Sequence, residues 1–353
     1  MPIPHRPSFP LLSVTLVGLV ALLLCTRHAQ AADTRELILA AYSVPKEAYE
    51  RLIIPAFQRS WKQRTGQDVR VRSSYGASGA QARAILGGFD ADVAVLSLEG
   101  DVDQIVKGGL ITHDWRKGPH AGMISASVVA LGVRKGNPKG IKGWEDLTKP
   151  GVDVLYPNPK TSGGAMWDVI AIYGAGLKLA EQRAAGKPLA PGAAEAQAVE
   201  LLRGIQKNVR VMDKSGRESV TTFERGVGDV IITYENELLP RVKSQRPYEI
   251  IVPNETVWIE NPAAVVDRYA DKHKVRDLAE AFVAFLHGPE AQAAFLELGF
   301  RPVDRGDAKQ AASFPQPARL FAVSDLGGWD QISGKLFGTT GVWTKVVEDL
   351  ARR

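Results

Sequence analysis

Three short segments of the chain combine serine and glycine where a strand pattern gives way to a helix pattern. They are Ser78-Gly79, Ser162-Gly163-Gly164 and Gly216-Arg217-Glu218-Ser219. The first backbone N–H groups of a helix have no intrahelical acceptor, glycine lets a ligand approach them, and the helix dipole favours negative charge there. Ser-Gly-Gly also caps ordinary helices, so a single segment would be weak evidence. The prediction depends on three such segments occurring in one chain. The three segments together indicate an oxyanion site made of uncharged hydrogen-bond donors.

The surrounding elements alternate between strand and helix patterns and decide where these segments lie. Strands are predicted at residues 37–40, 69–71 and 93–96, with helices at 48–61 and 80–86 between them. This βαβαβ order implies a parallel sheet with helices on both faces. A second alternating region follows, with elements predicted at residues 152–156, 164–179, 194–206, 209–212, 221–225 and 230–234. All three serine segments follow the carboxyl ends of strands, where ligands bind in open α/β sheets.

The predicted fold class is α/β, with two lobes that are each a mostly parallel sheet flanked by helices and a ligand cleft between them. Two separate segments of the chain are expected to form the first lobe. The expected division is a signal peptide at 1–31, lobe 1 at 32–130, lobe 2 at 131–256, a return to lobe 1 at 257–313, and a C-terminal tail packed on the lobes at 314–353.

Residues 1–31 have the pattern of a cleavable secretory signal. His5 and Arg6 precede an apolar run at 11–25, and Ala29-Gln30-Ala31 fits the small-residue cleavage rule. The single cysteine, Cys25, lies in this segment, so a mature chain would have no disulfide and no thiolate metal site. The formal net charge is +5, or +3 without this segment, and acids and bases are interspersed. Such a balance gives no indication of nucleic-acid binding.

Further motifs accompany the serine segments and make the sequence similar to a known family. With Ser78-Gly79, they resemble the periplasmic sulfate/thiosulfate-binding proteins of ABC importers, from about residue 37 to 329. The motifs are Asn158-Pro159-Lys160-Thr161-Ser162-Gly163-Gly164-Ala165, Glu224-Arg225-Gly226-Val227-Gly228-Asp229-Val230, Tyr234-Glu235-Asn236-Glu237, Arg134-Lys135-Gly136-Asn137-Pro138-Lys139 and Gly288-Pro289-Glu290-Ala291-Gln292.

The resemblance implies a type II two-lobed binding protein that holds dehydrated sulfate between its lobes through neutral donors. It also implies a periplasmic location, an ABC permease as partner, a monomer and no cofactor. Tyr234 stands where the family often has Trp, and Ser43 where it usually has Asp. The implied ligand-binding residues are Ser78, the Ser162 hydroxyl, the amides of Gly163, Gly164 and Ser219, and the variant positions Tyr234 and Ser43.

Sulfate carries no proton at neutral pH, so a pocket of donors without a carboxylate acceptor suits it. Hydrogen phosphate would leave its own donor unpaired there. No donor named above titrates between pH 5 and pH 8, so the affinity for sulfate is expected to be flat over that range. The alternatives are another tetrahedral oxyanion (molybdate, tungstate or phosphate) and a ligand sensor that shares the pocket.

Several of these residues also have simpler interpretations. Ser43 fits an ordinary helix cap, and Tyr234 fits a packed aromatic with its hydroxyl on the backbone. Arg217 is expected either to orient its turn or to pair with a carboxylate, rather than to contact the ligand. The segment Gly76-Ala77-Ser78-Gly79-Ala80 is somewhat like the nucleophile elbow of a secreted serine hydrolase, but Ala80 replaces the final glycine. None of His113, His120, His273 and His287 has a partner at metal-ligand spacing, so no metal is expected.

Overall fold

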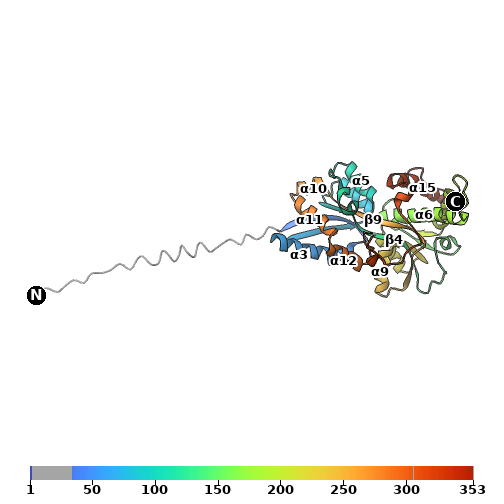
Figure 1. Ribbon diagram of the computed structural model, residues 1–353, viewed down its shortest axis with the longest axis horizontal. Helices are drawn as coiled ribbons and strands as arrows, with labels where there is room; N and C mark the ends of the chain where they lie inside the picture. The colour runs from blue at the N-terminus through green and yellow to red at the C-terminus, as the bar shows by residue number, and fades with distance from the viewer. Residues whose placement is uncertain (2–33, 305, 353) are drawn as a thin grey trace.

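The computed structural model describes Met1 and residues 34–304 and 306–352. The signal peptide predicted at 1–31 otherwise lies outside the described residues. Two lobes lie side by side and give an elongated molecule (Figure 1). The α/β fold class is confirmed, because each lobe has a sheet flanked by helices. Within the described ranges, no helix has the length and apolar character needed to span a bilayer.

The first lobe is built around three parallel strands from the N-terminal part of the chain. β1 (Arg35–Tyr42) pairs in parallel with β2 (Val69–Gly76) on one side and with β3 (Val93–Val95) on the other. β1 and β3 are apolar because helices cover both faces of the sheet. These helices are α2 (Lys46–Ala48), α3 (Ile54–Thr65), α4 (Ser78–Leu86), α5 (Glu99–Lys107), α10 (Asp267–Lys272), α11 (Arg276–Leu286) and α12 (Pro289–Glu297).

The second lobe contains the other strands and the longest helix. β5 (Val154–Leu155) pairs in parallel with β6 (Val209–Val211) and with β7 (Val230–Tyr234). β8 (Tyr248–Ile251) lies beside the end of a strand that enters from the first lobe. The helices follow the predicted order, but one begins earlier than the helix expected at residues 221–225. They are α6 (Gly163–Ala184), α7 (Ala193–Lys207), α8 (Gly216–Glu224) and α9 (Glu235–Lys243).

Two long antiparallel strands join the lobes. β4 (Met123–Arg134) pairs with β9 (Glu255–Val265) over its first half and with β7 and β8 over its second half. The end of β9 then pairs with β3 in the first lobe. The resulting strand order is β2-β1-β3-β9-β4-β7-β5-β6. Boundaries at residues 130 and 256 therefore fall inside these strands, and we propose the same division into lobes with β4 and β9 as the crossings.

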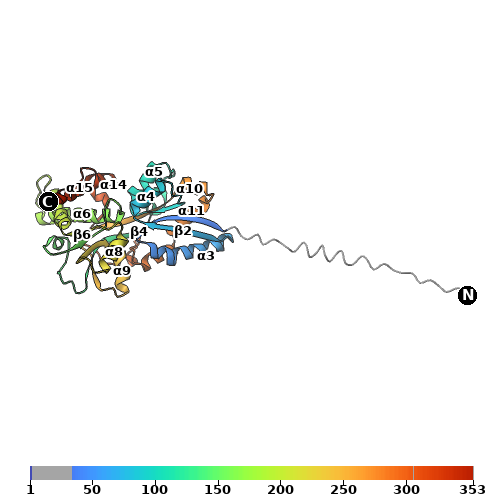
Figure 2. The same cartoon turned by 180° about the vertical axis from the view of Figure 1, so that it is seen from behind.

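The C-terminal tail packs mainly on the second lobe. β10 (Arg319–Phe321) extends the sheet beside β9, and α14 (Trp329–Phe337) and α15 (Val342–Ala351) lie near α6 (Figure 2). The Trp329 ring meets the ring of Trp167 edge-on, with centroids 4.8 Å apart. Trp343 donates from Nε1 to the Tyr156 hydroxyl at 2.9 Å. The first contact holds the tail against α6, and the second holds it against the segment between β5 and α6.

Candidate functional site

A small cavity lies where the strand ends of the two lobes meet. The centre of a water molecule is free to move in only about 10 Å³ of it, which is near the least that one water needs. The walls thus nearly close on each other. Both lobes contribute to the lining: Tyr42, Ser43, Val44, Gly76, Ala77, Ser78 and Ser97 from the first, and Pro157, Ser162, Gly164, Asp168, Gly216, Thr233 and Tyr234 from the second.

The first turn of α6 presents donors to this cavity. The Ser162 Oγ accepts the Ala165 N–H at 3.3 Å, which leaves the Ser162 O–H free to donate toward a ligand. The amides of Gly163 and Gly164 have no acceptor among the described residues. A Cβ at position 163 would lie 2.8 Å from the Ser97 Oγ of the other lobe. Glycine is therefore required there by the close approach of the lobes.

Ser78 opens α4, but its hydroxyl is already engaged. It donates to Asp101 Oδ2 at 2.5 Å and accepts the Ser97 N–H at 2.8 Å. Burial raises the pKa of Asp101 to about 6, and the hydrogen bond from Ser78 opposes that rise. The backbone N–H groups of Ser78 and Gly79, in contrast, have no acceptor in the part of the chain that the structure describes. At this position the structure thus offers an amide rather than a hydroxyl.

The donor expected at Ser219 needs correction. Because α8 begins at Gly216, the Ser219 N–H lies inside the helix and donates to the Ser215 carbonyl at 3.1 Å. Its hydroxyl donates to Asp213 at 3.0 Å. The free amides at this helix start are those of Gly216 and Arg217, and Gly216 lines the cavity. The anion-binding end of α8 thus comes one turn earlier than the sequence suggested.

Tyr234 and Ser43 both face the cavity, from opposite lobes. The Tyr234 hydroxyl lies 2.8 Å from the Ser97 Oγ, so it contacts the other lobe rather than the backbone. Burial raises the pKa of Tyr234 well above its usual range, which keeps the O–H protonated. Ser43 is not a helix cap, because α2 is preceded by Pro45 and no side chain caps it.

Several of the described residues that line the cavity were missed by the sequence analysis, and Asp168 is the one among them with a carboxyl group. Asp168 lies on α6, two helical turns into the helix, and its side chain lines the cavity while being only 1% exposed. A pocket without a carboxylate acceptor was expected from the sequence, and Asp168 adds a carboxyl group to the lining. The available signal was an acid in the otherwise apolar segment 165–172, which follows the Ser-Gly-Gly motif.

The geometry at Ser78 does not support nucleophilic catalysis. The proton of its hydroxyl is held by a carboxylate, and the described histidines with hydrogen-bond partners lie elsewhere, His113 on Asp267 and His273 on Asp92. A serine nucleophile needs a base that can take its proton. Across the described ranges, there is also no group of three side chains suited to bind a metal ion.

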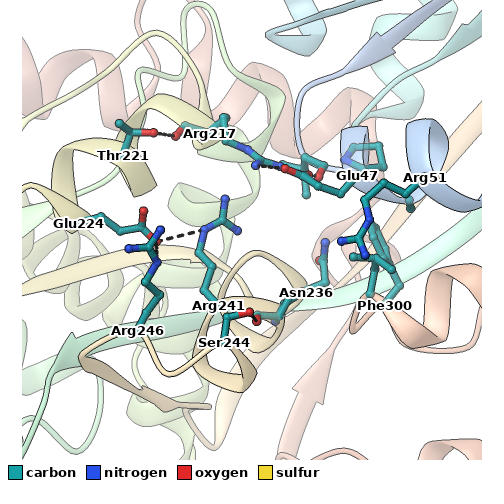
Figure 3. Close-up of a pocket in the computed structure, with 15 residues that line it drawn as sticks. Glu47, Arg51, Arg217, Thr221, Glu224, Asn236, Arg241, Ser244, Arg246 and Phe300 are labelled. Atoms are coloured by element: carbon teal, nitrogen blue, oxygen red, sulfur yellow. Dashed lines mark hydrogen bonds and ion pairs between the residues drawn. The ribbon is translucent and has the colours of Figure 1, made fainter.

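A second, larger cavity of about 420 Å³ lies beside the first. Most of the charged side chains that line it form ion pairs. Figure 3 shows Arg217 reaching from α8 across to Glu47 of the other lobe, with two hydrogen bonds of 2.5 Å each. Arg241 pairs with Glu237 at 2.9 Å and with Glu224 at 3.4 Å. Arg217 thus pairs with a carboxylate, as predicted, and it joins the lobes next to the small cavity.

Comparison with known proteins shows which family this chain resembles. Residues 37–301 match the family described as bacterial extracellular solute-binding protein. The sulfate-binding protein of Synechococcus elongatus is 44% identical over 321 residues, which cover 90% of this chain and 88% of that protein. The thiosulfate-binding protein of Pseudomonas aeruginosa is 33% identical over 322 residues, which cover 90% and 93% of the two chains.

A solved structure agrees with these relatives. The sulfate-binding protein SubI from Mycobacterium tuberculosis superposes with a TM-score of 0.76 at 36% sequence identity, over 86% of this chain and 99% of that one. The chain therefore belongs to the bacterial extracellular solute-binding proteins, in the family of the periplasmic sulfate- and thiosulfate-binding proteins.

Proposed function

We propose that this protein binds sulfate or thiosulfate in the small cavity between its lobes and delivers it to the permease of an ABC importer. Proteins of this family are transport components rather than enzymes. A periplasmic location follows from the family. Export through a cleaved segment at 1–31, and action as a monomer, complete the proposal. The ligand-binding groups are the Ser162 hydroxyl and the amides of Ser78, Gly163, Gly164, Gly216 and Arg217, with Tyr234 and Ser43 beside them.

The observation that carries the proposal is the convergence of three helix starts on one cavity. α4, α6 and α8 each direct free backbone N–H groups to it, and their dipoles add positive potential there. No Lys or Arg is among the described residues that line the cavity. Charge-assisted hydrogen bonds of about 1.5–3 kcal/mol each would balance the cost of removing water from a small dianion.

The closed form of the cavity indicates how such a ligand enters. A tetrahedral oxyanion is larger than the single water that the cavity would hold. The lobes must therefore move apart to admit the ion and then close around it, as in the hinge motion of other two-lobed binders.

Titration calorimetry with sulfate, thiosulfate, molybdate, tungstate and phosphate tests the proposal. Sulfate or thiosulfate should bind with micromolar or tighter affinity, equivalent to about 8 kcal/mol or more. The other anions should bind more weakly. Tighter binding of molybdate, tungstate or phosphate would contradict the assignment of the ligand, and binding of none of the anions would contradict the site.

A further inference from the structure

Asp168 is a buried carboxyl group that lacks the usual partners. Its side chain is 1% exposed, and its Oδ1 accepts no hydrogen bond from any described residue. The same side chain lines the cavity in which the proposed anion binds. A buried carboxylate is normally paired or hydrogen-bonded, because an isolated buried charge is strongly unfavourable.

The groups around Asp168 do not supply a compensating charge. Tyr156, which follows β5, and Tyr234 at the end of β7 act on it as uncharged phenols, and burial raises the pKa of both. Tyr42 at the end of β1 is a third phenol at the cavity, with its pKa raised by burial. On the α4 side, Asp101 is held by Ser78. None of these four groups supplies a positive charge that would compensate an ionised Asp168.

Two arginines at this end of the cleft act on other carboxylates. Arg83 of α4 favours the ionised form of Asp101 and so lowers its pKa. Arg217 directs its guanidinium to Glu47 at 2.5 Å and to Glu237 at 3.5 Å, outside the lining of the small cavity. The amino-terminal dipole of α6 favours negative charge, but the bound anion itself would occupy that position. Burial accordingly raises the pKa of the Asp168 carboxyl well above its usual range.

We propose that Asp168 is protonated when a dianion such as sulfate occupies the cavity, and that it donates its O–H to the anion. This inference rests on the proposed function and adds a rule for ligand choice. The proton comes from solvent, so the closed protein holds the dianion together with one proton. Two like charges in one closed site disfavour each other, as in paired carboxylates, and a shared proton removes that repulsion.

The proposed proton on Asp168 predicts different behaviour for oxyanions that carry a proton and oxyanions that do not. A fully deprotonated anion such as sulfate requires a neutral Asp168. Hydrogen phosphate carries its own proton and donates it to an ionised Asp168, which is then the acceptor that such a ligand needs. Sulfate affinity therefore falls about tenfold per pH unit above the pKa of Asp168 in the open, ligand-free protein. This replaces the flat dependence expected from the neutral donors alone. Hydrogen phosphate does not follow this slope.

Calorimetry of sulfate and phosphate between about pH 6 and pH 9, in two buffers with different ionisation enthalpies, tests this coupling. The wild-type protein should take up a proton with sulfate as the pH rises, and its affinity should fall. Asp168→Asn keeps a neutral donor of the same shape, so its sulfate affinity should be flat and exceed that of the wild type at high pH. Asp168→Asn should also bind phosphate more weakly, because a neutral amide oxygen accepts the phosphate proton less strongly than a carboxylate does.

Asp101→Asn is the matched control, because Asp101 is the other buried carboxyl near the cavity and its pKa is raised to about 6. It should keep the alkaline slope of the wild type. Infrared spectra of the sulfate complex at about pH 8 should contain the carbonyl band of a protonated acid, which Asp168→Asn removes. The proposal is overturned if Asp168→Asn shows the same slope as the wild type, or if that band is missing. Sulfate binding to neither protein at any pH would instead overturn the proposed function itself.

Discussion

At the scale of single residues, the site depends on which polar groups are still free to bind. Ser162 caps α6 through its oxygen and keeps its proton for a ligand, whereas the hydroxyl of Ser78 is used by Asp101 and Ser97. Two serines in similar motifs thus have different roles. Mutations at the two positions should affect ligand binding by different mechanisms.

Ser162→Ala should weaken sulfate binding by about 1–3 kcal/mol, because a donor to a charged ligand is lost. Some of its effect on protein stability comes from loss of the helix cap. Asp114→Ala removes a cap from a short helix in the first lobe and serves as the control, with an unchanged dissociation constant expected. Calorimetry on the three proteins measures both effects. An unchanged affinity in Ser162→Ala would remove this hydroxyl from the site.

Gly163→Ala should weaken sulfate binding about tenfold or more. The added Cβ would lie 2.8 Å from the Ser97 Oγ, and overpacking of this kind costs about 1–3 kcal/mol. The contact crosses the lobes, so the closed form is the one that is penalised. Gly334→Ala, with no atom within 4 Å of its new Cβ, is the control and should bind as the wild type. Equal affinities of all three proteins would show that closure does not require glycine at position 163.

The sequence predicted most of these residues because serine and glycine at helix starts are local signals. Ser162, Gly164 and Ser78 all face the cavity, as does Tyr234 from the end of its strand. Asp168 was missed because its place in the cavity depends on the packing of α6 against the other lobe. The apolar residues around it, at 165–172, indicate that the acid is buried but not that it reaches the cavity.

At the scale of elements, the helix boundaries decide which amides are free. The helix predicted at 48–61 is divided: a π-helical turn at Tyr49–Ile53 precedes α3, and Pro55 falls in the first turn of α3. Gly66 ends it with φ of 74°. α8, in contrast, begins at Gly216 rather than near residue 221, because Ser215 caps it. Ser215 lies among other polar residues, so no clear sequence signal marked the start of α8.

The start of α10 contains a carboxylate whose charge should stabilise the fold. Asp267 accepts the Thr112 N–H at 2.6 Å and pairs with Arg276 at 2.7 Å. Burial tends to raise the pKa of Asp267, but these partners hold it well below the usual range. A lowered pKa in the folded protein means that the stabilisation is complete above the unfolded pKa of about 4, and that it is lost as the pH falls below that value.

Asp267→Asn should therefore lower the free energy of unfolding at pH 7 by about 1–3 kcal/mol. The difference from the wild type should shrink as the pH falls from about 4. Thermal unfolding of both proteins from neutral pH into the acid range measures the trend. A difference that stays constant with pH would mean that the charge of Asp267 contributes little.

At the scale of the whole molecule, contacts between the lobes gather on a few residues. Ser97 of the first lobe accepts the Trp167 Nε1–H at 2.9 Å through its carbonyl and contacts Tyr234 through its hydroxyl. Arg217 and Glu47 add an ion pair at the edge of the same interface. The described form is therefore the closed one, and the contacts that close it border the ligand cavity.

A buried ion pair links α9 to the return segment. Arg301 donates to Glu235 at 2.7 Å, and both side chains are 3% exposed or less. Arg301→Met should destabilise the protein by about 3–5 kcal/mol, because Glu235 is left buried without its partner. The double variant Arg301→Met/Glu235→Leu should regain much of that loss. Urea unfolding compares the three proteins, and a double variant no more stable than Arg301→Met would contradict this account.

The two strands that cross between the lobes determine how the molecule can open. Along β4 the pairing partner changes from β9 to β7 between Val128 and Val129. Bending at that junction leaves the ladders on either side whole, so few backbone hydrogen bonds need to break. The lobes should therefore separate by flexing a continuous sheet. Amide exchange at β4 and β9 should stay slow with and without ligand, while the first turns of α4, α6 and α8 become protected when the ion binds.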